Sequence, residues 1–180
     1  MDKAKDYNLL HVVMENSEHN DWQDAVQEWE IEDCQEDDNQ EESCICGKEH
    51  LKYLFTIKNK NNGKVLTPIG SSCIKKFERE ELDELTSINK KLFELLHAME
   101  KNKYIRLDNE FFTRKLLTYL YKEGAFTTNK YGTAKGSYEF IVKMFNKKKD
   151  PTPKQDKKVK AIIMNDIRPF LKRILKDKIK

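Results

Sequence analysis

The chain has 180 residues, of which 34 are basic and 31 acidic, and its formal net charge is +3. It contains no apolar run near the roughly 20 residues of a transmembrane helix, and no apolar stretch follows its charged first residues as in a signal peptide. We therefore expect a cytoplasmic protein with no membrane partner. In that compartment, the four cysteines indicate metal ligands or thiols rather than disulfides.

The small net charge is the sum of two regions of opposite sign. Residues 1–43 contain 15 acidic and 2 basic side chains, whereas residues 44–180 contain 16 acidic and 32 basic ones. This division indicates an acidic arm beside a body that binds an anionic partner.

The start of the chain is predicted to be helical. An apolar stripe favours a helix over 3–15, and the helical spacing of tryptophans and small apolar residues favours a second helix over 21–30. These two helices define an N-terminal unit, residues 1–29.

The next segment, 30–43, is predicted to be acidic and flexible. Residues 30–42 include eight acidic side chains and no basic one, and their mutual repulsion favours an exposed, mobile chain. Such a segment is a solubilising linker, a tail that competes with nucleic acid for a basic face, or a surface for a basic protein partner.

Residues 44–80 are predicted to form a β-hairpin followed by a helix. Aromatic and β-branched residues favour a strand over 53–57, and a turn rich in asparagine leads to a return strand over 64–67. Ser71 is expected to cap the helix, which places Cys73 in its first turn.

The remaining region, 81–180, is predicted to be helical with a basic C-terminus. Thr152 begins a capping box with proline at the first helical position, and Pro169 is expected to kink or split that last helix. The expected fold is α+β and mainly helical, with a small zinc-stabilised hairpin and helix before a C-terminal helical region. Apolar residues recur at helical spacing over about 86–99, 110–122, 137–145 and 152–174.

Three cysteines provide the strongest chemical signal. Cys44 and Cys46 lie in a turn before the hairpin and Cys73 follows it, an order that can bring thiolates together. Structural zinc prefers four ligands in a tetrahedron. The expected fourth ligand is His50, which has a short tether, or else Cys34. Alternatively, the first two cysteines share one face of a strand and the third packs in the core as a small apolar residue.

These residues resemble a treble-clef zinc module. The stretch 29–77, with CICG at 44–47 and GSSC at 70–73, is similar to small uncharacterised zinc-binding proteins of phages and mobile elements. The resemblance implies a bound Zn²⁺ and a phage or mobile-element origin. However, the first pair is C-x-C rather than C-x-x-C, and the helix supplies one cysteine rather than two, so the fourth ligand is left open.

The sequence predicts no catalytic residues. The treble-clef resemblance raises the weaker alternative of a nuclease with His50 as general base, but the helix after Cys73 lacks a histidine or asparagine in its first turns. Cys46 with His50 as nucleophile and base is weaker still. No phosphate-binding glycine motif is present. We therefore expect a non-enzymatic protein.

The C-terminal lysines indicate contacts with nucleic acid. Residues 141–180 hold 14 basic and 4 acidic side chains. Lysines at the start of a helix oppose its dipole, and phosphate contacts would explain them, although a solvated helix face is the alternative. Lysine dominates over arginine, which favours backbone contacts over base-specific ones. The expected contact residues are Lys75, Lys76, Arg79, Lys147, Lys148, Lys149, Lys154, Lys157 and Lys158.

The leading hypothesis is therefore a zinc-binding accessory protein that binds nucleic acid mainly through its backbone. The alternative is a protein that binds and modulates host nucleic-acid or defence machinery through the acidic segment 30–42. The sequence does not distinguish DNA from RNA, and it leaves the oligomeric state open.

Overall fold

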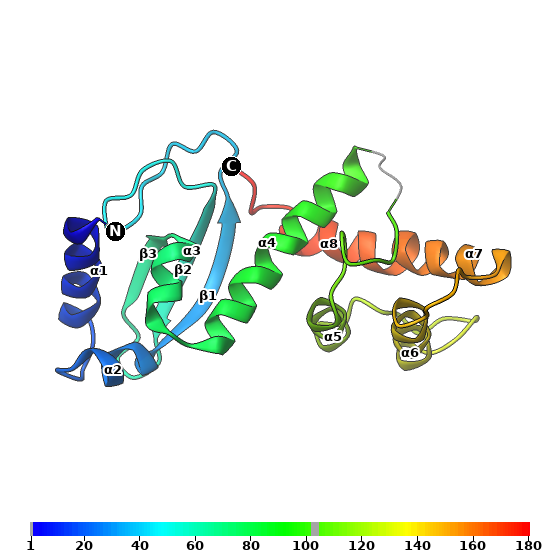
Figure 1. Cartoon of the computed structure of the whole chain (residues 1–180), viewed down its shortest axis with the longest axis horizontal. Helices are drawn as coiled ribbons and strands as arrows, with labels where there is room; N and C mark the ends of the chain where they lie inside the picture. Colours follow the sequence, from blue (N-terminus) through cyan, green and yellow to red (C-terminus); the bar gives the residue numbers. More distant parts are fainter. Residues whose placement is uncertain (1, 102–104) are drawn as a thin grey trace. The chain divides into compact units, whose positions relative to one another are not determined.

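The structure is a computed structural model that describes residues 2–101 and 105–180. It is mainly helical and contains a three-stranded antiparallel sheet in the order β1-β2-β3, which confirms the expected α+β class (Figure 1). Within the described ranges, every helix is too short or too polar to cross a membrane.

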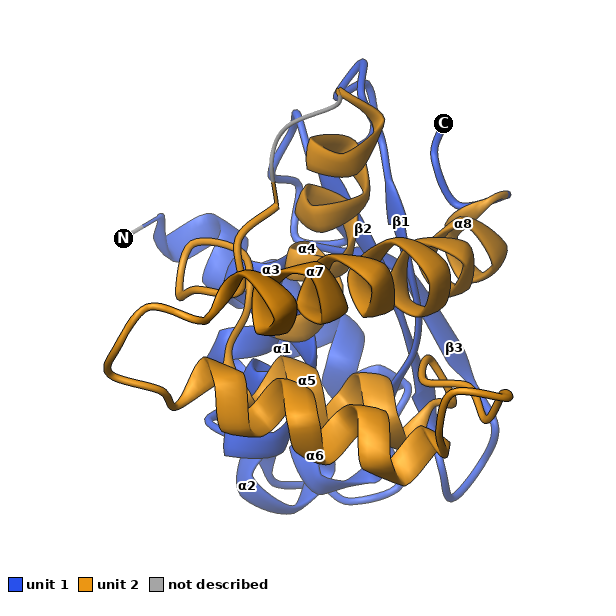
Figure 2. Ribbon diagram, turned by 90° about the vertical axis from the view of Figure 1, so that its right-hand side faces the viewer, with its two compact units in different colours: residues 1–87, 177–180 blue, residues 88–176 orange. Residues whose placement is uncertain are grey.

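The chain divides into two compact units (Figure 2). Unit 1 comprises residues 1–87 and 177–180, and unit 2 comprises residues 88–176. This division differs from the expected four regions: the N-terminal helices, the acidic segment and the hairpin belong to a single unit. The boundary lies inside a long helix instead of between the hairpin unit and the helical region.

Unit 1 contains the sheet and the short helices that flank it in sequence. The expected first helix, the hairpin and the helix after it are all present, and the hairpin strands pair antiparallel. Its elements are α1 (Lys3–Glu15), α2 (Trp22–Ala25), a 3₁₀ turn η1 (Val26–Glu28), β1 (Trp29–Glu36), β2 (Tyr53–Asn59), β3 (Val65–Ile69), α3 (Ser71–Ile74) and a 3₁₀ turn η2 (Lys75–Phe77).

Strand β1 corrects two predictions. The helix expected over 21–30 ends early, and the acidic segment begins as a strand paired with β2 rather than as a flexible chain. Lysines from other segments of the chain offset its charges. The Nζ atom of Lys58 lies 3.2 Å from a carboxylate oxygen of Glu32, and Lys178 forms an ion pair with Asp33. These ion pairs offset the repulsion that suggested disorder.

A buried aspartate orders the part of the acidic segment that follows β1. The carboxylate of Asp37, which is 3% exposed, accepts the backbone N–H groups of Asn39, Glu41 and Glu42 at 3.0, 2.9 and 3.3 Å. Burial raises the pKa of Asp37, but these N–H groups outweigh it and lower that pKa. The segment is therefore a fixed turn.

The core of unit 1 lies against the sheet. Phe55 and Ile57 of β2 and Ile69 of β3 are completely buried, together with Trp29 of β1. Trp29 also donates its indole N–H to the hydroxyl of Ser17 at 2.9 Å. This packing fixes the hairpin, which lies between the two cysteine-bearing segments in the sequence.

The regular elements of unit 2, over its described residues 88–101 and 105–176, are all helices. Three of its helices begin at Glu80, Arg114 and Ala134 rather than near residues 86, 110 and 137, and Thr113 and Thr133 cap the second and third of these. The Thr152 capping box is confirmed, and a π-helical turn before Pro169 divides the last helix in two. The elements are α4 (Glu80–Glu100, shared with unit 1), α5 (Arg114–Lys122), α6 (Ala134–Phe145), α7 (Pro153–Ile162), η3 (Ile163–Ile167) and α8 (Arg168–Leu175).

The core of unit 2 is formed by one face of each helix. The rings of Tyr121 and Tyr138 stack with centroids 4.4 Å apart and join α5 to α6. The hydroxyl of Thr127 donates to buried Asp166 at 2.7 Å and so ties the loop after α5 to η3. The completely buried side chains are Phe93, Phe112, Leu116, Leu117, Leu120, Ile141, Ile167 and Leu171.

Candidate metal centre and basic unit

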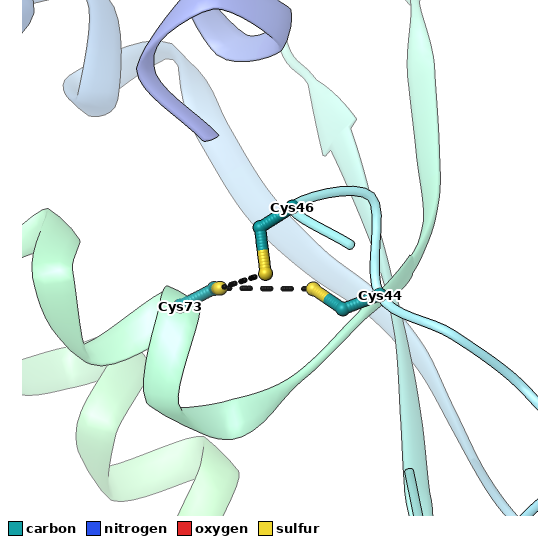
Figure 3. A group of neighbouring side chains, drawn as sticks. All are labelled: Cys44, Cys46 and Cys73. Carbon is teal, nitrogen blue, oxygen red and sulfur yellow. Dashed lines mark hydrogen bonds between the residues drawn. The ribbon is translucent and has the colours of Figure 1, made fainter. Parts of the chain in front are cut away.

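Three buried cysteines meet beside the hairpin (Figure 3). Cys44 and Cys46 come from the turn between β1 and β2, and Cys73 comes from the first turn of α3. The three residues are 2–4% exposed, and all four cysteines of the chain lie outside disulfides. The expected convergence of these three side chains is therefore present, although Gly70 rather than Ser71 occupies the cap position of α3.

Backbone contacts fix the cysteine turn. Gly47 has a φ of +91° and donates its N–H to the carbonyl of Cys44 at 2.7 Å, a conformation that glycine adopts without strain. The N–H of Ile45 donates to the carbonyl of Pro68 at 3.0 Å, and the side-chain amide of Asn8 donates to the carbonyl of Cys46 at 3.2 Å. The turn is thus held from both β3 and α1.

The spacing of the sulfurs suits a tetrahedral metal ion. The Sγ atoms of Cys44 and Cys73 are 3.6 Å apart, those of Cys46 and Cys73 are 3.3 Å apart, and all three lie within 4.8 Å of one another. Four sulfurs about 2.3 Å from a zinc ion lie about 3.8 Å from one another. The three thiols could therefore bind a metal ion with small adjustments.

Hydrogen bonds among the sulfurs favour an ionised thiol. The sulfurs of Cys44 and Cys73 share a hydrogen bond, and the backbone N–H of Gly70 donates to the sulfur of Cys44 at 3.3 Å. The hydrogen bond with Cys73, opposed by burial and aided by backbone N–H groups, lowers the pKa of Cys44 to about 5. The same bond and burial raise the pKa of Cys73. A metal ion would displace that proton.

The structure does not bring either expected fourth ligand to the cluster. Among the described residues, no other histidine, cysteine or carboxylate has a ligand atom within 4.8 Å of all three sulfurs. His50 is exposed, has a φ of +62° and places its Nδ1 atom 3.1 Å from the carbonyl of Gln40. Cys34 is buried on β1, opposite Phe55 of β2.

No family model, no curated protein and no solved structure matches this chain.

The basic residues expected in the first unit are largely used for internal contacts. Arg79 is only 10% exposed, donates to the backbone carbonyls of Val26 and Trp29, and lies 2.6 Å from a carboxylate oxygen of Glu81. Lys76 forms an ion pair with Asp6 of α1, whereas Lys75 is exposed. The guanidinium of Arg79 is therefore engaged by contacts within unit 1.

The basic residues expected near the C-terminus all lie in unit 2. Lys154 and Lys157 are exposed on α7, and Lys158 lies over the ring of Phe140 at 4.3 Å. The run 147–149 lines a cleft of about 530 Å³ together with Lys160 and with Arg106, a basic residue that the sequence did not single out.

The opposite charges of the chain are separated by unit. Unit 1 has 22 acidic and 12 basic side chains, a net of −10, whereas unit 2 has 9 acidic and 22 basic ones, a net of +13. The separation of acidic and basic residues along the sequence therefore follows the division into units. Most of the positive net charge of residues 44–180 lies in unit 2.

Proposed function

We propose that this chain is a non-enzymatic protein that binds nucleic acid through unit 2 and holds a zinc ion at its three cysteines. The net charge of +13 on unit 2 supports the first part of the proposal. A surface with that excess of lysine attracts phosphates and gains free energy from the counterions that each contact releases.

The cysteine cluster supports the zinc part. Cys44, Cys46 and Cys73 would hold the ion, and a ligand from outside the cluster would complete its coordination. The order of a two-cysteine turn, a hairpin and a cysteine-bearing helix also supports a site of the treble-clef type. A zinc ion there would hold the turn, the hairpin and α3 together, which is the role of structural zinc in small domains.

Binding to labelled strands across a salt series tests the nucleic-acid part. We expect fluorescence anisotropy to show binding at about 50 mM salt and a loss of affinity of 10-fold or more at about 200 mM. A chain that binds neither single strands nor duplex at the lower salt concentration would overturn this part. Elemental analysis of the purified protein tests the zinc part, with one zinc per chain expected.

A second function is favoured by the charge of unit 1, which is −10. An acidic surface of that size suits a basic protein, as would be expected of a modulator of host nucleic-acid or defence machinery. Affinity capture from a lysate, with and without nuclease treatment, separates the two functions. Partners that disappear after nuclease treatment support nucleic-acid binding, and partners that remain and depend on Glu30 and Glu32 support the modulator.

A further inference from the structure

We propose that the cleft in unit 2 binds single-stranded nucleic acid, with one unpaired base against Phe145 and the adjoining phosphates on Lys148 and Lys149. The inference rests on the proposed function and deepens it, because it names the binding site and the form of nucleic acid that the site accepts.

The cleft lies between two segments of unit 2. One wall is the segment 105–109, which precedes α5, and the other is the end of α6 with the turn to α7, residues 144–151. Asp156, Val159 and Lys160 of α7 complete the lining. Its volume of about 530 Å³ falls within the range of about 300–1,000 Å³ that is typical of small-ligand sites. One nucleotide therefore fits inside it.

Part of the cleft lining is apolar. Ile105, Met144 and Val159 are 8%, 9% and 6% exposed, whereas Phe145, the last residue of α6, is half-buried and lines the same cleft. A partly exposed aromatic ring beside an apolar wall is a platform on which any nucleobase can stack. Such a mixed lining suits a nucleotide, because a base can contact the apolar side chains while its phosphates lie against the lysines.

The charged groups around the cleft are mainly basic. The cleft is lined by five cationic side chains and three carboxylates, which gives the lining a net charge of +2. Two of the acidic residues are engaged: Asp156 lies 2.8 Å from Lys160, and Asp108 accepts the N–H of Glu110 at 3.1 Å. The lining charges are Arg106, Lys147, Lys148, Lys149 and Lys160 with Asp108, Asp150 and Asp156.

Two of the lysines are available for phosphates. Lys147 donates to the side chain of Gln155 at 2.8 Å and to the carbonyl of Asp150 at 3.3 Å. Lys148 and Lys149 are exposed, and neither forms an ion pair with a residue in the part of the chain that the structure describes. They follow Phe145 by three and four positions in the chain and line the same cleft, where they could contact the phosphates on either side of a stacked base.

A cleft that combines a partly exposed aromatic ring with lysines favours a single strand over a duplex. Base faces in a duplex are covered by their neighbours, so a paired base cannot stack on Phe145 inside the cleft unless it leaves the duplex stack. Lysines beside one aromatic ring also match the general pattern of sequence-tolerant binding to single strands, in which stacking and backbone attraction act together.

Fluorescence anisotropy with the full chain tests this inference, using labelled (dT)₁₂, (rU)₁₂ and a 12-base-pair duplex. We expect Phe145→Leu, which keeps an apolar side chain but removes the ring, to weaken single-strand binding about 5- to 50-fold and duplex binding less than about 2-fold. Phe145→Trp should retain the affinity for single strands. Circular dichroism checks that each variant is folded.

Two double substitutions that remove the same charge test whether the lysines of the cleft act by local contacts or only through the net charge of unit 2. Lys148→Ala with Lys149→Ala should reduce the salt dependence of single-strand binding more than Lys172→Ala with Lys176→Ala, which removes the same charge from α8 and the residue that follows it. Equal effects of the two pairs, or an unchanged single-strand affinity of folded Phe145→Leu, would overturn the inference while leaving nucleic-acid binding intact. A wild-type chain that binds no strand would instead overturn the proposed function.

Discussion

The sulfur atoms of Cys46 and Cys73 lie 3.3 Å apart although 27 positions separate these residues in the sequence. The intervening chain is the whole hairpin, so a metal ion shared by the two residues would fasten the turn before β2 to the helix after β3. Because such an ion would bind the folded chain and not the unfolded one, it would stabilise unit 1 in proportion to its affinity.

Cys73→Ser should remove the bound zinc. A serine hydroxyl is a poor ligand for zinc, and two remaining thiolates hold the ion weakly. We expect about one zinc per wild-type chain and near-background zinc in the variant, measured by elemental analysis. A strong chelator should lower the melting temperature of the wild type by about 5–10 °C and leave that of Cys73→Ser unchanged.

Cys34→Ser is the matched control for that experiment. Cys34 is buried like the other cysteines but lies on β1, outside the three-sulfur cluster. We expect the variant to keep its zinc and its response to the chelator, even if the new hydroxyl costs some stability. A folded Cys34→Ser chain without zinc would show that this residue is the fourth ligand.

His50→Gly should also keep the zinc. The side chain of His50 points to the carbonyl of Gln40 and not to the cluster, and its φ of +62° is one that glycine adopts more readily. We expect unchanged zinc content and a free energy of unfolding within about 1 kcal/mol of the wild type. Loss of zinc from this variant would restore the role that the sequence suggested for the histidine.

Arg79→Lys should lower stability without weakening the binding of nucleic acid. The guanidinium donates to the carbonyls of Val26 and Trp29 while it faces Glu81, and a lysine cannot reproduce these bonds. We expect a loss of about 1–3 kcal/mol in urea unfolding, with the salt dependence of binding unchanged. Lys75→Ala, which removes an exposed charge nearby, provides the comparison that leaves stability unaltered.

Local patterns predicted most of the helices, the hairpin and the convergence of three cysteines, but not β1 or the contacts that depend on distant residues. In β1, Trp29 and Ile31 alternate with charged residues, a strand pattern that the run of acidic side chains obscured. The lysines that offset those charges come from β2 and the last residues of the chain. No property of the acidic segment itself could have indicated them.

At the candidate sites too, local sequence patterns indicated some residues and missed those that only tertiary packing brings together. A short tether made His50 a reasonable ligand, but the left-handed backbone at that residue directs its ring elsewhere. The lysine run 147–149 was visible in the sequence, whereas Arg106 joins it only because the segment before α5 packs beside the end of α6. Clefts made by tertiary packing leave no periodic signal.

Glu28 should make unit 1 sensitive to acid. Its carboxylate is 1% exposed and accepts the N–H groups of Glu18 and His19 and the side-chain amide of Asn59, at 2.5–3.0 Å. Burial raises the pKa of Glu28, but these donors outweigh it and lower the pKa from 4.5 to about 2. The stabilisation, up to about 3 kcal/mol, is therefore complete above pH 4.5 and is lost as the pH falls towards 2.

Urea unfolding at several pH values between 5 and 2 measures this effect. The His19 side chain, whose pKa its bond to Glu28 raises above 6.5, is protonated over this whole range and does not confuse the result. Glu28→Gln should be about 2–3 kcal/mol less stable than the wild type at pH 5, because an amide N–H₂ would face the backbone donors. The difference should shrink towards pH 2, since the wild-type carboxylate is then protonated. Glu30→Gln, on the exposed face of β1, should follow the wild type, and a constant gap between Glu28→Gln and the wild type would contradict the assignment.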